Sequence, residues 1–364
     1  MPIDRSYQMA QKKYNIGVFI GRFQPVHAGH LSVIEQGLKL ADHVVVLIGS
    51  ASSPRCHRNP FSYAEREDMV TKSIPADLRS RVQICPLEDN AYNDSAWVNN
   101  VQSKVERAAW KVGFLSEPKI VLIGHNKDES SYYLKMFPQW DSVEASNYKE
   151  LNSTQIRNVY FSNVGHMWVK DADGHRIGDL PQDHIVSSHT REFLEGFLET
   201  DAYKFICDEY EFVQKYKLSW MSAPYPVNLV CTDACVIKSG HVLLVERGAH
   251  PGKGLFALPG GYLNVNERCE TGMIRELREE TKLKVPEAVL RGSITKEKVF
   301  DDPNRSSRGR VMTVGYLIDL GTGPLDKVKG SDDAAKAGWV QLSDLDPKNM
   351  FEDHYSIIKY LVGF

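Results

Sequence analysis

Two histidines stand three residues apart in the segment GRFQPVHAGH, which occupies residues 21–30 directly after an apolar run. A glycine-assisted turn that leads from a strand into a helix presents backbone N–H groups to an anion, and phosphate is the usual one. His27 and His30 would face one ligand at the start of that helix, and Arg22 adds a permanent positive charge. These residues favour a nucleotide polyphosphate site, where donors meet the charge that develops in an in-line displacement.

A second predicted helix start carries the sequence NSTQIR, residues 152–157, in which two hydroxyls precede an arginine. Taken alone, this is an ordinary N-cap pattern, and two histidines near a helix start can also be simple capping residues. The two segments together favour phosphate binding, because the first directly follows a predicted strand and the second supplies a matching set of polar groups.

Three glutamates, Glu276, Glu279 and Glu280, recur within the sequence RELREE. Their spacing places them on one face of a helix, where like charges repel unless a cation neutralises them. Carboxylate oxygens select Mg²⁺ or Mn²⁺, and these metals commonly also engage substrate phosphates. A glutamate-rich helix face alone is more often a solvated surface. The metal prediction therefore depends also on the glycine pair and the further glutamate upstream of the helix.

The first half of the chain alternates short apolar runs with helix-like stretches. Nearly continuous apolar runs are typical of strands buried on both faces of a parallel sheet. Strands are predicted at residues 16–21, 43–50, 81–87 and 119–124, and helices at 29–40, 63–73, 95–112 and 129–136. This alternation predicts an α/β domain with a doubly wound parallel sheet, in which ligands bind beyond the carboxyl ends of the strands.

The second half has a different pattern. Residues 227–237 and 241–247 predict a hairpin that turns at Lys238, Ser239 and Gly240. A helix is then predicted at residues 269–282, followed by strands at 311–320 and 338–342. These elements favour an α+β domain with a mixed sheet.

We place the domain seam near Ser222, where Pro224 and Pro226 break the preceding helix. The predicted division is a first domain at residues 1–185, a helical segment and linker at 186–224, and a second domain at 225–364. Within the middle of the chain, residues 159–220 hold a polar loop and an amphipathic helix that begins near Thr190.

The composition of the chain argues against a nucleic-acid-binding, membrane-spanning or secreted protein. The chain has 364 residues and a formal net charge of −3, which argues against a basic surface for nucleic acid. No apolar run approaches a membrane span of roughly 20 residues, and the N-terminus lacks a signal-peptide pattern. Six scattered cysteines favour a reducing compartment. We expect a cytoplasmic enzyme without nucleic-acid or membrane partners; a homo-oligomer is left open.

The first half resembles the H-x-G-H nucleotidyltransferase superfamily and, more closely, the archaeal-type nicotinamide-mononucleotide (NMN) adenylyltransferases. The resemblance covers about residues 16–162 and rests on GRFQPVHAGH, RNPFSYAERE, GHNKDESSYYLKMFPQW and NSTQIR. It implies a Rossmann-like fold and attack of the NMN phosphate on the α-phosphorus of ATP, with Mg²⁺ neutralising charge. It implies catalytic roles for His27, His30 and Arg157. The same three residues would contact ATP, together with Gly21, Arg22, Phe23, Ser153 and Thr154. The implied NMN contacts are Arg66, Trp97 and Asp128. Trp97 would stack on the cationic nicotinamide ring.

The second half, about residues 228–364, resembles the Nudix hydrolases. Residues 261–283 match the Nudix box G-x5-E-x7-R-E-U-x-E-E-x-G-U at every defined position but one, because Lys282 replaces the last glycine. Lysine does not readily adopt positive φ, so we expect the loop after the helix to differ from the family. The resemblance implies metal-assisted hydrolysis of a diphosphate. Its implied residues are the metal ligands Glu276, Glu279 and Glu280, with Glu279 also catalytic, and the loop and orienting residues Gly260, Gly261, Glu267 and Arg275.

The resemblance favours ADP-ribose as the Nudix substrate, because proteins that fuse these two domains are known for that activity. Two alternatives remain open. The first domain could transfer a nucleotidyl group to another phosphate acceptor, with the Nudix domain acting on another nucleoside diphosphate derivative. Either domain could instead be a non-catalytic sensor of NAD metabolites.

A glycine-rich segment at residues 248–254 lacks the spacing of a phosphate-binding loop, and we interpret it as a connecting loop.

Overall fold

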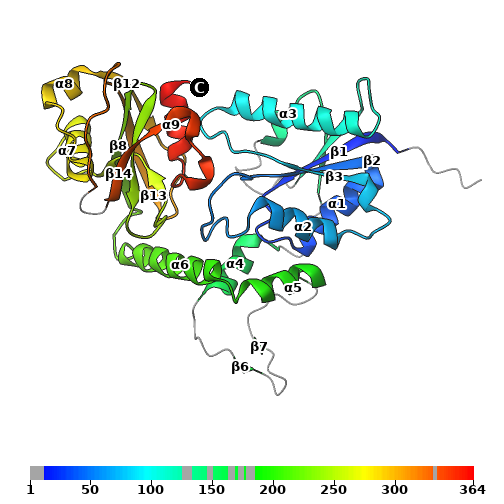
Figure 1. Cartoon of the computed structure of the whole chain (residues 1–364). Helices are drawn as coiled ribbons and strands as arrows, with labels where there is room; N and C mark the ends of the chain where they lie inside the picture. The colour runs from blue at the N-terminus through cyan, green and yellow to red at the C-terminus, as the bar shows by residue number, and fades with distance from the viewer. Residues whose placement is uncertain are drawn as a thin grey trace, which may run out of the picture.

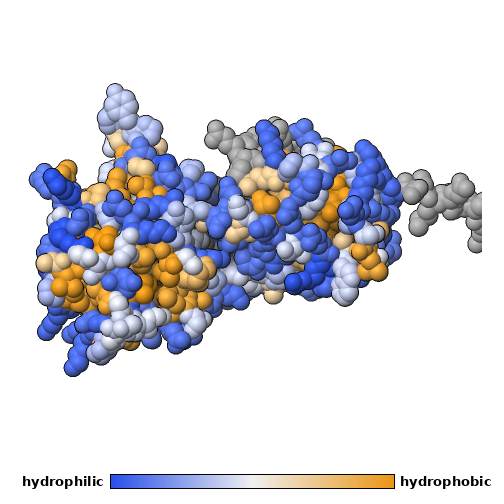
Figure 2. All heavy atoms as spheres, turned by 90° about the horizontal axis from the view of Figure 1, so that it is seen from above, coloured by the Kyte–Doolittle hydropathy of each residue, from blue (hydrophilic) through white to orange (hydrophobic). Residues whose placement is uncertain are grey.

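The computed structural model describes residues 12–124, 133–145, 151–162, 169–170, 176–177, 185–330 and 334–364. Two sheet-containing domains lie side by side, and a long helix, α6 (Asp201–Ser219), runs beneath the second domain toward the first (Figure 1). Seen from above, the molecule has two lobes that meet at a narrower region, and hydrophilic residues cover much of both (Figure 2). No described helix is both long and apolar enough to cross a membrane.

A parallel sheet forms the centre of the first domain. Its described strands are β1 (Tyr14–Gly21), β2 (Ala41–Ile48), β3 (Val82–Pro86), β4 (Ile120–Gly124) and β5 (Asp141–Glu144). They lie in the order β3-β2-β1-β4-β5, and all neighbours pair in parallel. The strand order reverses between β1 and β4, and in sheets of this kind ligands bind beyond the carboxyl ends of the strands at such a point. The predicted doubly wound α/β fold is confirmed.

Helices pack on both faces of this sheet. They are α1 (Ala28–Leu40), α2 (Tyr63–Ser73), α3 (Asp94–Lys111), α4 (Ser153–Phe161) and the 3₁₀ turn η1 (Arg79–Arg81). In β2, Val44 and Val46 belong to one hydrophobic cluster, whereas Val45 and Leu47 belong to the other. This alternation explains the unbroken apolar run in the sequence, because both faces of the strand are buried.

In the first domain, one predicted element is left untested and one strand was missed. The helix predicted at residues 129–136 lies mostly outside the described residues. Strand β5 was not predicted, because its sequence DSVE is short and mostly polar and it lies at an edge of the described sheet.

The second domain is built on a mixed sheet with the order β10-β9-β8-β13-β12, to which β11 adds against β8 and β14 against β9. The central pair, β8 and β13, is parallel, and the other pairs are antiparallel. The strands are β8 (Asn228–Lys238), β9 (His241–Arg247), β10 (Phe256–Ala257), β11 (Gly260–Tyr262), β12 (Ile294–Phe300), β13 (Arg310–Asp319) and β14 (Ala334–Gln341). The predicted α+β domain is confirmed.

Helices α7 and α9 cover opposite faces of this sheet. The helical elements are α7 (Cys269–Thr281), α8 (Glu287–Gly292), α9 (His354–Val362) and the 3₁₀ turns η3 (Leu342–Asp344) and η4 (Pro347–Asn349). In β8, Ala234 and Val236 pack with residues of α7, whereas Cys235 packs with residues of α9. The expected hairpin is present, and Ser239 and Gly240 both take positive φ at its two-residue turn.

Our expectation for the loop after α7 was wrong. Lys282 adopts the left-handed conformation with φ of 52°, the conformation that suits a glycine at this helix end. Its N–H donates to the carbonyl of Arg278 and closes the last turn. A non-glycine residue accepts this conformation at a cost of about 1–2 kcal/mol, which the closed turn and the buried Leu283 that follows can offset.

The segment between the domains is mostly helical. It contains the short pair β6 (Val169–Lys170) and β7 (Arg176–Ile177), then α5 (Ser188–Phe197) and α6. Leu194, Phe197 and Ile206 belong to a hydrophobic cluster of the first domain. Helix α5 and the start of α6 therefore share that domain's core, while the rest of α6 continues toward the second domain (Figure 1). The domain bounds given above remain predictions.

A single buried carboxylate on α6 contacts both domains. Glu209 is 1% exposed, and its Oε1 accepts the backbone N–H of His57 at 2.9 Å and lies 3.1 Å from Nδ1 of the same histidine. Its Oε2 accepts the N–H of Gly252, in the second domain, at 3.0 Å. Burial alone would raise the pKa of Glu209, but the hydrogen bonds from His57 and Gly252 outweigh it and hold that pKa low. The carboxylate therefore remains ionised while it holds α6 against both domains.

Further polar contacts join the domains directly. The guanidinium of Arg58 donates to the carbonyls of Asn304 at 2.7 Å and Ser306 at 2.8 Å. The hydroxyl of Tyr92 bonds to Asp353, and its ring packs edge-on against Phe300. The domains therefore share an interface that includes buried polar groups.

Replacing Glu209 with alanine is expected to destabilise the chain by about 2–4 kcal/mol, because two buried N–H groups lose their acceptor. Thermal unfolding followed by calorimetry measures the effect. Asp208→Ala is the matched control, since Asp208 is the neighbouring acid and is exposed. Equal melting temperatures for the two variants would show that the Glu209 contacts do not stabilise the fold.

Candidate functional sites

The two histidines of the first motif lie against each other at the start of α1. His27 is the N-cap residue, and its N–H donates to Nδ1 of His30 at 3.2 Å. The imidazole rings stack with centroids 3.7 Å apart. Because α1 begins directly after the carboxyl end of β1, both rings lie at the crevice where a doubly wound sheet binds ligands.

The second motif meets the first through hydrogen bonds to the loop after β1. The hydroxyl of Ser153 donates to the carbonyl of Pro25 at 3.1 Å. Arg157 donates to the carbonyl of Gln24 at 2.6 Å and to the hydroxyl of Thr154 at 3.2 Å. The structure thus brings together two sequence segments more than a hundred residues apart, as the phosphate-site hypothesis requires.

Positive charge accumulates at this junction. Arg157 is buried, and burial followed by the nearby charge of Arg22 lowers the pKa of Arg157 to about 10. The Arg22 side chain is exposed beside it. Cationic groups at a helix N-terminus attract an anion, and a polyphosphate would neutralise both guanidinium groups.

Arg66 lies in the core rather than on a solvated surface. It is 1% exposed and donates to four backbone carbonyls, those of Ser62, Arg22, Gly49 and Ser50, at 3.2, 2.8, 2.7 and 3.1 Å. These bonds fasten the turn after β1 to the end of β2. These contacts make Arg66 a structural support of this turn. The contact with NMN that the resemblance implies stays a prediction.

The remaining residues predicted for this site have varied surroundings. Phe23 is buried and has a positive φ. Its ring packs against the ring of His30, with the two centroids 4.6 Å apart, so Phe23 supports the histidine pair. A Cβ on Gly21 would come within 3.1 Å of the Phe23 ring. Trp97 is half-buried near the start of α3 and packs against Tyr133 and Phe137. Asp128 lies outside the described residues.

In the second domain, Arg275 organises the acidic helix. Its guanidinium bonds both oxygens of Glu267, at 2.6 and 3.1 Å, and also contacts Glu276 at 2.7 Å and Glu279 at 3.0 Å. The hydrogen bonds from Arg275 lower the pKa of Glu267 to about 2. Arg275 thus ties Glu267, in the segment before α7, to the acidic helix.

The glycine pair of the motif is required by close packing. A Cβ on Gly261 would come within 2.5 Å of Oε1 of Glu276, and one on Gly260 within 2.2 Å of the carbonyl of Thr232. The N–H of Gly260 donates to Oε2 of Glu280 at 3.0 Å. Strand β11 therefore lies directly against the acidic face of α7 at Gly261 and against β8 at Gly260, and a side chain at either position would clash.

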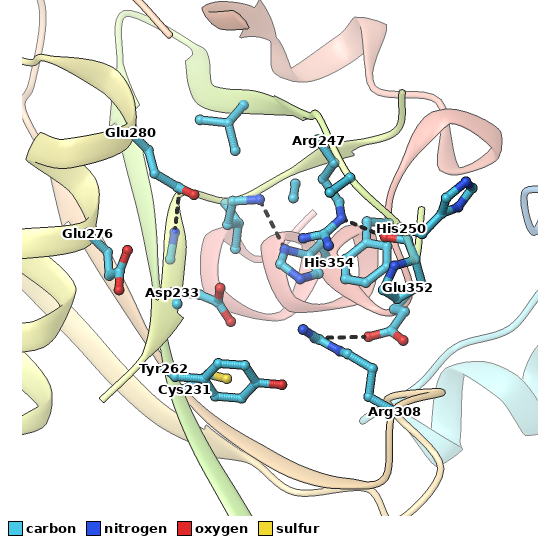
Figure 3. Close-up of a pocket in the computed structure, with 18 of the residues that line it drawn as sticks. Cys231, Asp233, Arg247, His250, Tyr262, Glu276, Glu280, Arg308, Glu352 and His354 are labelled. Carbon is cyan, nitrogen blue, oxygen red and sulfur yellow. Dashed lines mark hydrogen bonds and ion pairs between the residues drawn. The ribbon is translucent and has the colours of Figure 1, made fainter. Parts of the chain in front are cut away.

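Glu276 and Glu280 line a cavity of about 460 Å³, a volume typical of small-molecule sites. Figure 3 shows their carboxylates pointing from α7 toward Asp233, with Arg247, Arg308 and Glu352 across the cavity. Burial, with repulsion from Glu276 and Asp233, raises the pKa of Glu280 to about 7. This repulsion is the physical signature of a place where a cation would be stabilised.

The donor set suits a hard divalent cation, although the side chains do not converge on one point. Among the described residues, no group of three or more histidine, cysteine, aspartate or glutamate side chains is arranged to hold a metal. Glu279 is half exposed and paired with Arg275, and it does not line the cavity. A cation bound through all three glutamates would share Glu276 and Glu279 with Arg275, which contacts one oxygen of each.

Sequence reasoning missed several residues of this cavity, because they come from separate strands, from loops, from the interdomain helix and from α9, and share no spacing in the sequence. Arg305 forms a buried two-point ion pair with Asp353, at 2.9 and 3.0 Å. The loop at residues 248–254 supplies Gly248, Ala249, His250 and Pro251 to the lining, so it is more than a connection. The other missed lining residues include Phe212, Tyr216, Asp233, Arg247, Arg308, Phe351, Glu352 and His354.

Family comparisons match both domains. The sequence model of the cytidylyltransferase-like family matches residues 18–159, and that of the NUDIX domain matches residues 229–361. A nicotinamide/nicotinic acid mononucleotide adenylyltransferase from Acinetobacter baylyi is 34% identical over 54% of this chain and 94% of its own length. An ADP-ribose pyrophosphatase from Methanocaldococcus jannaschii is 36% identical over 40% of this chain and 77% of its own.

A solved structure matches nearly the whole chain. It is a bifunctional NMN adenylyltransferase/ADP-ribose pyrophosphatase from Francisella tularensis, in complex with AMP and a manganese ion. That protein is 35% identical, superposes with a TM-score of 0.83, and the match covers 96% of this chain and 98% of the Francisella chain. The chain therefore belongs to the family of bifunctional NMN adenylyltransferases and ADP-ribose pyrophosphatases.

Proposed function

We propose that the first domain transfers AMP from ATP to NMN, giving NAD and pyrophosphate, and that the second hydrolyses ADP-ribose to AMP and ribose 5-phosphate. The junction of His27, His30 and Arg157 at the carboxyl edge of the parallel sheet carries the first assignment. The cavity lined by Glu276 and Glu280 carries the second. Membership of the bifunctional family supports both.

In the first reaction, a phosphate oxygen of NMN attacks the α-phosphorus of ATP, and the bond from that phosphorus to the bridging oxygen of pyrophosphate breaks. No covalent intermediate with the protein is needed, so positioning and charge stabilisation supply the catalysis. We assign His27, His30 and Arg157 to the charge that develops on the phosphoryl oxygens. Gly21, Arg22, Phe23, Ser153 and Thr154 would shape the ATP site or hold its polyphosphate, and Trp97 and Asp128 would contact NMN.

In the second reaction, water attacks one phosphorus of the diphosphate and gives up a proton, and the bond from that phosphorus to the bridging oxygen breaks, so that AMP and ribose 5-phosphate are released. We assign Glu276, Glu279 and Glu280 as ligands of Mg²⁺ or Mn²⁺, with Glu279 also as a candidate base. When bound, the cation would lower the pKa of a water molecule and neutralise the diphosphate. Arg275 and Glu267 orient the ligand-bearing helix, and Gly260 and Gly261 let the diphosphate approach it.

We also place the protein in the cytoplasm. All six cysteines are free thiols in the structure, which supports a reducing compartment.

His27→Ala is expected to lower the rate of NAD formation by at least about a hundredfold, because a donor to the reacting phosphates is lost. A coupled assay with ATP, NMN and Mg²⁺ measures NAD directly. ADP-ribose hydrolysis by the same variant serves as an internal measure of folding. His189→Ala is the control, since His189 is exposed on α5. Similar NAD formation by both variants would contradict the assignment.

Arg66→Ala is expected to reduce both stability and NAD formation, because the carbonyls of Arg22, Gly49 and Ser50 lose their donor. The melting temperature of the first domain and the KM values for ATP and NMN separate the two possible roles. A positioning role predicts a lower melting temperature and changes for both substrates. A rise in KM for NMN alone, at unchanged stability, would instead indicate direct contact with NMN.

Glu280→Gln and Glu276→Gln are each expected to lower ADP-ribose hydrolysis by at least about a hundredfold, because a charged metal ligand is lost, with NAD formation retained. Release of AMP, measured by chromatography, follows the reaction. Glu270→Gln is the control, because Glu270 lies on the same helix but does not line the cavity. Chelation should stop hydrolysis in the wild type, and readdition of Mg²⁺ or Mn²⁺ separately would show which metal restores it. Hydrolysis that persists after chelation would contradict the metal assignment.

A further inference from the structure

The cavity of the second domain is closed partly by residues from outside that domain. Phe212 and Tyr216 line it, yet both belong to α6, which precedes the NUDIX match at residues 229–361. Figure 1 shows α6 lying along the underside of the second domain. The pocket is therefore incomplete without the interdomain helix.

The position of these aromatic side chains is set by the buried carboxylate on the same helix. Glu209, Phe212 and Tyr216 are spaced by three and four residues, so they lie along one face of α6. Glu209 bonds to Gly252, which follows the pocket-lining segment 248–251, and to His57 of the first domain. These bonds hold the helix in one register against the cavity.

Tyr216 contacts a part of the cavity wall where aromatic rings and arginine side chains lie close together. The hydroxyl of Tyr216 donates to that of Tyr262 at 3.0 Å. The Arg308 guanidinium lies 5.5 Å from the Tyr262 ring centroid, and that of Arg247 lies 4.0 Å from the centroid of Phe351. In Figure 3, Arg247 and Arg308 lie across the cavity from Glu276. One side of the cavity thus suits a cation and a diphosphate, while the other presents flat aromatic and guanidinium surfaces.

We propose that Phe212 and Tyr216 are specificity-determining residues of the Nudix reaction, forming an aromatic face on which the base of a nucleoside diphosphate substrate stacks. This proposal rests on the proposed hydrolase function and extends it to recognition of the base. Phe212 is 39% exposed, so part of its ring is available to a ligand. Base-to-aromatic stacking is sequence-tolerant and stabilises a bound base by about 1–3 kcal/mol. The first domain contributes indirectly, because His57 helps to hold α6 in place.

The test uses full-length Phe212→Ala and Tyr216→Ala, assayed for ADP-ribose hydrolysis with Mg²⁺. Each variant is expected to raise the KM for ADP-ribose about tenfold and to change kcat little, since the two rings are proposed to bind the base and not the reacting diphosphate. Inhibition by AMP should weaken by a similar factor, whereas inhibition by ribose 5-phosphate, which has no base, should not change. Tyr216→Phe retains the ring and should restore most of the affinity for AMP.

Leu218→Ala is the matched control, because Leu218 lies on α6, is 61% exposed and does not line the cavity. NAD formation by every variant reports whether the chain remains folded. If both alanine variants keep the wild-type KM and the wild-type inhibition by AMP, the proposal that these residues bind the base is wrong. It is also wrong if inhibition by ribose 5-phosphate weakens as much as inhibition by AMP.

Hydrolysis of a panel of nucleoside diphosphate sugars distinguishes failure of the proposed substrate, ADP-ribose, from failure of the proposed aromatic face. If the wild type does not hydrolyse ADP-ribose but hydrolyses another member, the proposed substrate is wrong. The KM comparison on that member then decides whether the aromatic face exists. If the wild type hydrolyses only diphosphates that lack a base, both proposals are overturned.

Discussion

A charged carboxylate buried between two domains needs a donor from each of them. Glu209 meets this requirement with the N–H groups of His57 and Gly252, and its depressed pKa reflects those bonds. The ionised carboxylate is stable in this buried position because both domains supply it with hydrogen-bond donors. The position of α6, and with it the composition of the second cavity, depends on this contact.

Both sites are proposed to bind phosphate groups, but the first site carries positively charged side chains, whereas the helix of the second carries negatively charged ones. The first gathers Arg22, Arg157 and the histidine pair, so that phosphate can be bound by cationic and neutral donors directly. The second gathers glutamates in a buried cavity, where burial and then repulsion from Glu276 and Asp233 raise the pKa of Glu280, so that a bound cation would be stabilised there. The net charge of −3 is a sum over both arrangements and describes neither of them.

The interface also limits how independently the domains can be treated. Arg58 bonds to the carbonyls of Asn304 and Ser306, in the loop that carries the buried Arg305. A fragment that begins after Pro224 would lose Arg58 together with the aromatic residues of α6. Its activity would report on an altered cavity as well as on the isolated Nudix chemistry.

Much of the fold could be predicted from the sequence, because each strand of the first sheet except β5 is an apolar run with its own local signal. The same holds for the hairpin at Ser239 and Gly240. The polar edge strand β5 lacked such a signal, and the left-handed Lys282 ran against the intrinsic preference of its residue type. In that case hydrogen bonding and packing at the helix end outweighed a local cost of about 1–2 kcal/mol.

The sequence by itself determined the two chemical centres, because their residues stand at short, regular spacings that local helix geometry converts into shared faces. His27 with His30, and Glu276 with Glu280, are such pairs. Only the tertiary structure decided that Arg66 is a buried support, that Ser153 and Arg157 meet the loop after β1, and that α6 completes the second cavity. These contacts join residues far apart in the chain, so they exist only after long-range packing has chosen which groups lose their water and must find a partner.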